Sequence, residues 1–215
     1  MRSVIKIISV AVTAVLLVAA APARRATAET TYFSTRSVLA DFFPKSERVT
    51  FRTYALDAPL KARLAQRLGY RPAKDRYTVF VATSKGKIDG YAVIDDEMGQ
   101  HLPITFATRL SSRAVVERLE IMIYRETRGD EVRDARFRRQ FEGKTAQDAL
   151  RLNHDVDAVS GATISSASLA VGVRRAAVLV EELAIGLGAL ATAPVPAAPA
   201  APAGRAPATR NAPIR

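Results

Sequence analysis

The chain has 215 residues and a formal net charge of +11, and it contains no Cys. It can therefore form no disulfide framework, no thiolate-bound iron–sulfur cluster and no Cys-linked c-type haem. Four of the excess positive charges lie in residues 1–28 and three in residues 189–215, which leaves +4 for the segment between them. That mild charge gives no argument for a nucleic-acid partner.

The N-terminal segment has the three parts of a secretory signal. Arg2 and Lys6 precede an uncharged apolar run, residues 7–21, and small residues at 21–28 offer cleavage sites. The run is shorter than the roughly 20 residues that span a bilayer, so we expect a cleaved signal peptide at 1–28. An uncleaved membrane anchor is the alternative. In either case the protein is expected to be exported, to the periplasm or the extracytoplasmic face of the membrane.

The C-terminal segment, residues 189–215, is rich in Ala and Pro and has no acidic or aromatic residue. This composition cannot build a core, and we expect a disordered tail. Its three arginines, Arg205, Arg210 and Arg215, allow peripheral contact with anionic lipid or cell wall. Residues 29–188 are long enough for one domain.

Helical and strand patterns alternate along the domain. In chain order we expect a helix at 38–43, a strand at 48–56, a helix at 58–68, and strands at 77–83, 88–94, 103–108 and 115–124. Asp57 is a suitable N-cap for the second helix and Gly69 a suitable end. In the last strand Arg118 and Glu120 alternate with apolar residues, which predicts one solvent-exposed face.

The pattern changes to helical spacing after the last strand. Phe137 and Phe141 are expected to be core residues on a short helix capped by Asp134, whereas the arginines around them (Arg133, Arg136, Arg138 and Arg139) are expected on a solvated face. Thr145 and Asp148 resemble a capping box that opens another helix.

The last predicted helix starts near Ile164. Its apolar face comprises Leu169, Val173, Ala176, Val180, Leu183 and Leu187, opposite Arg174, Arg175, Glu181 and Glu182. Strands clustered mid-chain with helices around them predict an α+β fold, a small antiparallel sheet covered on one side, with the long helix at the C-terminal side.

Residues 157–166 carry the most specific pattern, Asp-Ala-Val-Ser-Gly-Ala-Thr-Ile-Ser-Ser. A loop of small residues that opens a long helix exposes backbone N–H groups at the positive end of the helix dipole, which suits a phosphate group. Gly161 permits positive φ, and Ala162 adds little bulk beside the hydroxyl of Thr163. The simpler interpretation is that Ser160 or Thr163 is an ordinary N-cap.

The neighbouring polar residues have expected roles as well. Ser165 and Ser166 can add hydroxyl donors in the first turn. Asp157 is unsuited to bind phosphate because of its charge, and we expect it either to brace the loop by accepting backbone N–H bonds or to meet a cation during modification.

The pattern of an acidic residue, a spacer and Ser-Gly-Ala-Thr resembles the flavin-attachment motif of the FMN-binding domain family. That family includes the small flavin-bearing subunits of the sodium-pumping NADH:quinone reductase and of the Rnf complexes. The resemblance, which covers roughly residues 101–182, implies that a flavin transferase esterifies the phosphate of FMN to Thr163. It also implies an electron carrier that serves a redox protein or a membrane electron-transfer complex.

A second block, residues 124–144, resembles soluble members of the same family. The resemblance places the loop that carries Arg125, Glu126 and Arg128 beside the isoalloxazine ring. His101 is a further candidate to face the flavin. His101 and His154 are the two histidines of the chain, which are too few to indicate a His-rich metal site. No nucleotide-binding glycine loop is visible, so nicotinamide is not expected as a direct partner.

FMN exchanges one or two electrons, and the protein sets its position and potential. A covalent bond keeps the cofactor on an exported protein whatever its affinity. Two other functions fit the sequence, an extracytoplasmic flavin reductase with its own small acceptor and a non-redox binding module on the same fold. Bound flavin would distinguish the electron carrier and the reductase, which both need it, from the binding module, which does not.

Overall fold

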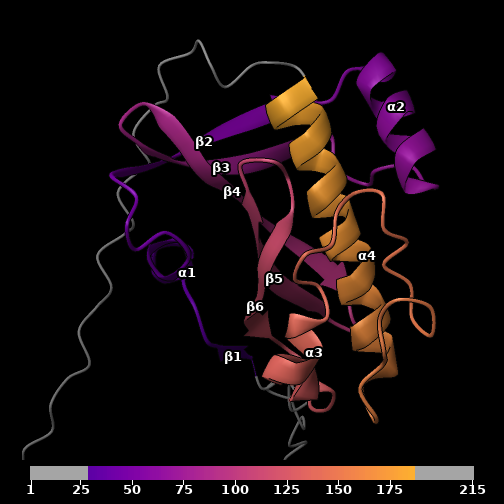
Figure 1. Cartoon of the computed structure of the whole chain (residues 1–215). Coiled ribbons are helices and arrows are strands. Elements are labelled where there is room, and N and C mark those ends of the chain that lie inside the picture. Colours follow the sequence, from indigo (N-terminus) through magenta and orange to yellow (C-terminus); the bar gives the residue numbers. More distant parts are fainter. Residues whose placement is uncertain (1–28, 187–215) are drawn as a thin grey trace, which may run out of the picture.

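The computed structural model describes residues 29–186. The expected signal peptide, the expected tail and Leu187 lie outside these residues. The described residues form an α+β domain, as predicted, in which a six-stranded antiparallel sheet is packed with helices (Figure 1). The strand order is β1-β6-β5-β4-β3-β2. The strands are β1 (Thr30–Thr31), β2 (Arg48–Ala55), β3 (Arg76–Ser84), β4 (Lys87–Met98), β5 (Pro103–Ser111) and β6 (Val116–Tyr124).

Strands β2 to β6 form a simple meander, in which each strand pairs with the next one in the chain. The β3–β4 hairpin turns at Lys85 and Gly86, whose φ values of 50° and 74° match the two-residue turn that follows strand twist. The short β1 then pairs with the far edge, on β6.

The helices are α1 (Thr35–Phe42), α2 (Ala58–Leu68), α3 (Ala135–Arg139) and α4 (Thr163–Leu179), with a 3-10 turn η1 (Asp130–Arg133) and a π-helical extension η2 (Val180–Gly186). The predicted cap of α2 is confirmed, because an Asp57 carboxylate oxygen accepts from the Leu60 N–H at 2.9 Å. Its predicted end is confirmed as well, since Gly69 is left-handed at φ 81°.

Helices cover both faces of the sheet, whereas the sequence suggested one. Helices α2 and α4 lie on one side and α1 on the other (Figure 1). The smaller core under α1 comprises Val38, Phe42, Phe43, Ala82, Ala92, Ala107 and Met122. Three of these seven are alanines on central strands, so this face carries no strong apolar pattern in the sequence.

The face of β6 that carries Arg118 and Glu120 is only partly exposed to solvent, because Glu120 is buried. Glu120 is only 6% exposed and forms ion pairs with Arg118, at 2.8 Å, and with Arg138. Arg138 also donates to the Leu119 carbonyl at 3.1 Å, so it covers the edge of β6 instead of lying on a solvated face. A buried carboxylate needs such partners, and the alternating pattern alone cannot show them.

The helix predicted after Thr145 is absent. Its two capping hydrogen bonds form, since the backbone N–H and the hydroxyl of Thr145 both donate to the Asp148 carboxylate at 2.8 Å. The chain then turns away at Leu150 and Asn153, which have positive φ of 46° and 59°. The bonds therefore close a turn and start no helix.

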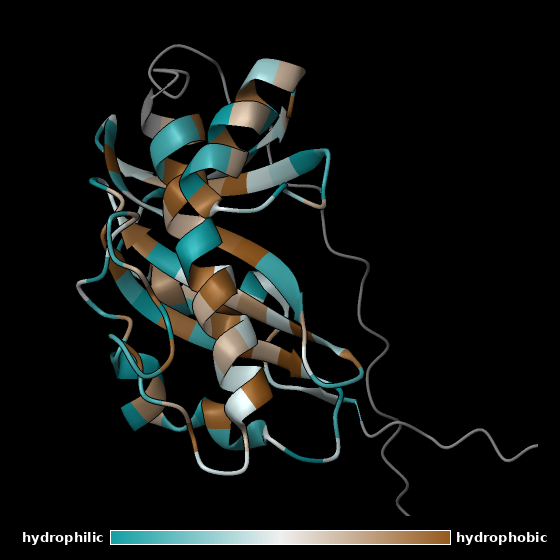
Figure 2. Cartoon of the chain, turned by 90° about the vertical axis from the view of Figure 1, so that its right-hand side faces the viewer, coloured by the Kyte–Doolittle hydropathy of each residue, from teal (hydrophilic) through white to brown (hydrophobic). Residues whose placement is uncertain are grey.

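Helix α4 is the main cover of the sheet, and Figure 2 views the domain from its side. Its predicted apolar residues Leu169, Val173, Ala176, Val180 and Leu183 are all buried. By length and composition Thr163–Ala184 could cross a membrane, but 67% of its most apolar stretch is buried inside the domain. The apolar residues of this segment are therefore mostly core residues of the domain.

Two arginines of α4 do not lie on an outer face as predicted. Arg175 is 7% exposed and binds the carboxylates of Asp95, at 2.6 Å, and Glu97. Burial opposes the charge, but these carboxylates raise the pKa of Arg175 above its usual value. Arg174 donates to the carbonyls of Arg67 and Leu68, both at 2.7 Å, and so caps the end of α2.

Candidate functional site

The first turn of α4 lacks the usual cap. Ala162 stands at the N-cap position, and no side chain accepts a hydrogen bond there. The interpretation of Ser160 or Thr163 as an ordinary N-cap is therefore wrong. The first backbone N–H bonded within the helix is that of Ser166, which donates to the Ala162 carbonyl at 2.9 Å. A capping Ser, Thr, Asp or Asn would be worth about 1 kcal/mol more than Ala, so this helix start forgoes stability.

Three unbonded amides precede that first bond. Within the described residues, the N–H groups of Thr163, Ile164 and Ser165 have no hydrogen-bond acceptor. The Thr163 side chain is exposed and its hydroxyl makes no bond to any described residue. An exposed hydroxyl beside three free donors at the positive end of a helix fits the acceptor of a phosphate ester.

The loop before the helix leaves that hydroxyl accessible. Gly161 has φ 80°, as its predicted conformation required, and a Cβ built on it would meet nothing within 4 Å. Ser160 and Gly161 are exposed, whereas Ala162 is 3% exposed. The Ala162 N–H donates to the Val159 carbonyl at 3.0 Å and closes the turn.

The two serines after Thr163 are tied into the fold. Ser166 is fully buried, donates to the Ala162 carbonyl at 2.9 Å and accepts from the Val159 N–H at 3.1 Å. Ser165 is 5% exposed and lies 3.0 Å from the Tyr124 hydroxyl. Both hydroxyls have partners within the domain, so the structure uses them to hold the loop in place.

The brace expected from Asp157 is made by other residues. The Gln140 amide bonds to both backbone groups of Asp157, at 2.7 and 3.2 Å. Asp155 accepts from the backbone N–H groups of Leu150 and Arg151 at 2.9 and 2.7 Å. The Asp157 carboxylate is exposed and bonds to none of the described residues, which leaves it open to the cation that the sequence also suggested.

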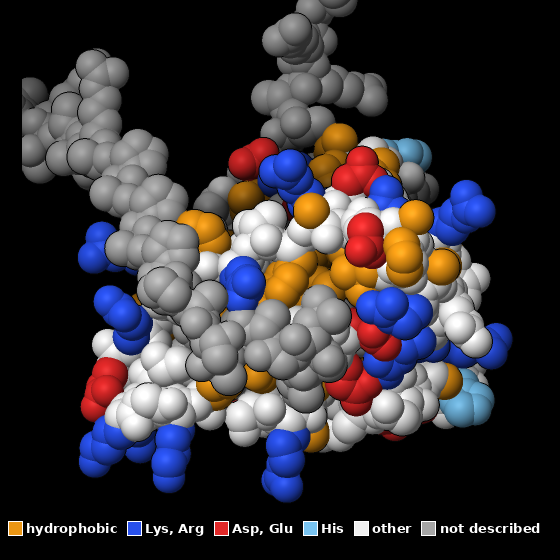
Figure 3. Space-filling view, turned by 90° about the horizontal axis from the view of Figure 1, so that it is seen from above, with side chains coloured by type: hydrophobic (Ala, Val, Ile, Leu, Met, Phe, Trp, Pro, Cys, Tyr) orange, Lys and Arg blue, Asp and Glu red, His pale blue; other side chains and the backbone are white. Residues whose placement is uncertain are grey.

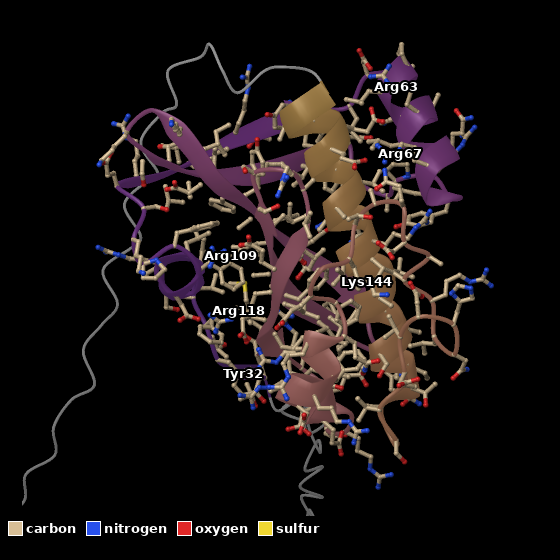
Figure 4. The ribbon with its side chains drawn as sticks, in the orientation of Figure 1. Tyr32, Arg63, Arg67, Arg109, Arg118 and Lys144 are labelled. Atoms are coloured by element: carbon tan, nitrogen blue, oxygen red, sulfur yellow. The ribbon has the colours of Figure 1, made fainter. Side chains whose placement is uncertain are left out.

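Electrostatics explain why Asp155 is the stronger brace. Its burial works against the charge, but the two backbone donors and Lys144, 3.7 Å away, outweigh this and lower the pKa of the carboxyl. Lys144 is labelled in Figure 4.

The structure joins the loop after β6 to the first turn of α4. The Tyr124 hydroxyl donates to the Arg128 carbonyl at 2.7 Å and contacts Ser165 on the helix. Burial raises the pKa of Tyr124, with the Ser165 bond opposing. Gly129, at φ 93°, lies against this pair, because a Cβ there would be 2.5 Å from the Tyr124 hydroxyl and 3.1 Å from Ser165 Oγ. The two segments that the resemblance implies lie together are in contact.

The three charged residues predicted beside the ring have different surroundings. Arg125 donates to the Pro103 carbonyl at 2.8 Å and to the Thr105 hydroxyl at 2.9 Å, so its guanidinium is turned to β5. Arg128 is exposed and forms no ion pair with the described residues.

Glu126 binds the β4–β5 loop. Its carboxylate accepts from the backbone N–H groups of His101 and Leu102 at 2.7 and 3.1 Å. The His101 side chain is exposed. Through Glu126, that loop is held at the same end of the domain as the first turn of α4.

Sequence reasoning missed Tyr124, Gly129, Gln140 and Asp155. Gly129 follows a strand by five residues, and a glycine there is a recognisable turn signal. The partners of the other three lie 17 to 41 positions away or in the backbone of a turn, and no local pattern gives those pairings.

A family model described as the FMN-binding domain matches residues 73–178. The match extends from the segment before β3 into α4, and so begins earlier than the resemblance recognised from residue 101 onward. No curated protein matches the chain.

The chain is also similar to solved structures. One is the crystal structure of NqrC from Shewanella oneidensis, at 18% identity and a TM-score of 0.44, covering 63% of this chain and 80% of that one. Another is the crystal structure of a subunit of the Na⁺-translocating NADH-quinone reductase from Parabacteroides distasonis, at 18% identity and a TM-score of 0.40, covering 66% of this chain and 84% of that one.

Proposed function

Because residues 73–178 belong to the FMN-binding domain family, we propose that this chain is an exported electron carrier that holds FMN through a phosphoester to Thr163. The observation that carries the proposal is the uncapped first turn of α4, where an exposed threonine hydroxyl stands beside three free backbone amides.

The residues of the first turn have separable roles. Thr163 supplies the oxygen that bonds to phosphorus, and the amides of Thr163, Ile164 and Ser165 stabilise the remaining phosphate charge. Gly161 leaves room for a flavin transferase, and the exposed Asp157 is available to a cation at the moment of transfer. Attachment would form a bond between Thr163 Oγ and the flavin phosphorus and break the P–O bond to the leaving group of an activated flavin nucleotide. The leaving group would take the bonding electrons, and the hydroxyl proton would pass to it or to water.

When bound, FMN would accept one or two electrons and pass them on. The loop held by Tyr124 and Glu126 gives the cofactor a fixed protein wall, and the exposed Arg128 favours the anionic reduced form. The partners of this function are the flavin transferase and a redox protein or membrane electron-transfer complex. We place them in the periplasm or at the extracytoplasmic face of the membrane.

Intact mass of the protein from a host that has a flavin transferase tests the proposal. The wild-type chain should carry ~438 Da, one FMN less water, on the peptide that contains Thr163, and keep it after denaturation. The same measurement shows whether the first 28 residues are removed. Thr163→Ala should fold and carry no flavin.

Ser112→Ala is the matched control, because it removes an exposed hydroxyl in the turn between β5 and β6, outside the attachment motif, and should keep full flavin. Flavin retained by denatured Thr163→Ala would exclude the proposed bond. A colourless wild-type protein would favour the binding-module alternative.

A further inference from the structure

Four large apolar side chains are exposed in the described residues: Tyr70, Met98, Ile164 and Val171, at 37, 57, 50 and 41%. Two of the four, Ile164 and Met98, are connected to the first two turns of α4. Ile164 directly follows Thr163, on the side of α4 that faces away from the core. Burying a side chain of this size would stabilise the fold, so two exposed ones at one site indicate a surface that binds something apolar.

A hydrogen bond ties the backbone of Met98 to the first two turns of α4. The Ser168 hydroxyl donates to the Met98 carbonyl at 2.5 Å. Ser168 is one helical turn after Ile164, and residues four apart share a helix face. The end of β4 therefore lies beside the first two turns of α4.

The segment that carries Met98 is fixed in place. Gly99 follows it, and a Cβ on Gly99 would be 2.5 Å from a Glu126 carboxylate oxygen. That oxygen also holds the His101 and Leu102 amides. Glu126 thus clamps the loop, and the exposure of Met98 is a feature of an ordered segment.

We propose that Met98 and Ile164 form an apolar seat for one face of the isoalloxazine ring of FMN attached at Thr163. The inference rests on the proposed function. A flavin bound one residue away has a high effective concentration at this surface, so a modest apolar contact suffices to populate the seated position. A thioether packs well against an aromatic face, and the branched Ile164 side chain supplies a stiff second contact.

The seat differs from the ring contacts that the resemblance implied. Arg125 and Glu126 direct their charged groups to β5 and to the β4–β5 loop. Their role at the ring becomes indirect, because Glu126 positions the strand end from which Met98 projects.

The test uses flavin-loaded full-length protein and three variants, Met98→Ser, Ile164→Ser and, as a control, Val171→Ser. Val171 lies on the same helix with similar exposure but seven residues beyond Ile164, about 10 Å along the axis. Intact mass gives FMN occupancy. Quenching of flavin fluorescence by iodide and the visible circular dichroism of the flavin report how far the ring is shielded and held.

Met98→Ser and Ile164→Ser should keep the FMN mass, raise the iodide quenching constant about twofold or more and weaken the flavin dichroism, because the ring loses its apolar contact. Val171→Ser should match the wild type. Met98 lies outside the attachment motif, so its variant remains informative if Ile164→Ser is poorly modified.

Full FMN mass with unchanged quenching in Met98→Ser overturns the seat and leaves the attachment intact. Equal changes in all three variants also overturn it, since they indicate a partner surface along α4. A wild-type chain without the FMN mass overturns both the proposed function and the seat.

Discussion

The two ends of α4 are built in opposite ways. At the far end Arg175 binds β4, and Arg174 binds the last carbonyls of α2. Just beyond this end, on η2, Glu181 and Glu182 bind Arg67. Figure 4 labels Arg67 and Arg63 on α2, and Figure 3 shows from above how acidic and basic side chains intermix at this end. At the near end the helix has no cap and leaves Thr163 exposed. A helix secured at one end can leave polar groups free at the other.

The largest effect is expected at the secured end. Arg175→Ala leaves the buried Asp95 carboxylate with Lys74 as its nearest cation and should destabilise the fold by about 3–5 kcal/mol. Chemical denaturation measures this. The exposed Arg139→Ala removes the same charge and should change stability by less than about 0.5 kcal/mol. Equal midpoints for the two variants would contradict the asymmetry between the ends.

The glycines at the open end give the next effect. Gly161→Ala must adopt positive φ but meets no atom, so it should cost about 1–2 kcal/mol. Gly129→Ala adds a clash with the Tyr124 hydroxyl and should cost about 3 kcal/mol in all. Thermal unfolding of the pair decides. If Gly161→Ala is the more destabilising of the two, a Cβ on Gly161 must meet other atoms, and the space beside the loop is not open.

Asp155 provides a pH-dependent test of the brace. Its folded pKa is lowered, so its contribution is complete above the unfolded carboxyl pKa and disappears as the pH falls through the folded value. Asp155→Asn should cost roughly 2 kcal/mol at neutral pH, with the difference from wild type shrinking in acid. Urea unfolding across that range measures both.

Asp157→Asn is the partner of that test, since it alters an exposed carboxylate two residues away. It should leave stability unchanged and slow flavin attachment. A stability loss equal to that of Asp155→Asn would restore Asp157 as the brace.

The smallest effect concerns the flavin potential and rests on the proposed function. Arg128→Ala should lower the potential by on the order of 10 mV, because an exposed cation is screened and 30 mV corresponds to about 1.4 kcal/mol. Arg125→Ala should lower the flavin potential by less, since the Arg125 guanidinium is bound to the Pro103 carbonyl. Redox titration compares both with Arg139→Ala. Identical potentials in all variants would remove the loop from the flavin site.

Local chemistry was predictable and long-range pairing was not. The Asp57 cap, the end of α2 at Gly69 and the start of α4 follow from residue type and spacing within one helical turn. The burial of Arg175 could not be predicted, because its partners lie on β4, about 80 positions earlier in the chain. Helical periodicity assigns a charged residue to solvent unless its partner is known.

The same contrast holds at the candidate site. The conformation of Gly161 was predicted from the motif, whereas the Tyr124–Ser165 contact spans 41 positions. The cover of the second face of the sheet was not predicted, because alanines on central strands do not give a clear apolar pattern in the sequence. Small side chains there admit the bulky Phe42 of α1, so the apolar volume resides in the partner helix.

The meander also sets the order in which the domain can assemble. Strands β2 to β6 each pair with a neighbour in the chain. The connections from β3 to β6 are short loops that close at low entropic cost, and only the β2–β3 connection is longer because it contains α2. Helix α4 comes later in the chain and can dock only on a sheet that already exists. The threonine at its start is therefore presented in its final geometry only by a finished domain, and an enzyme that recognises this geometry would act on folded chains alone.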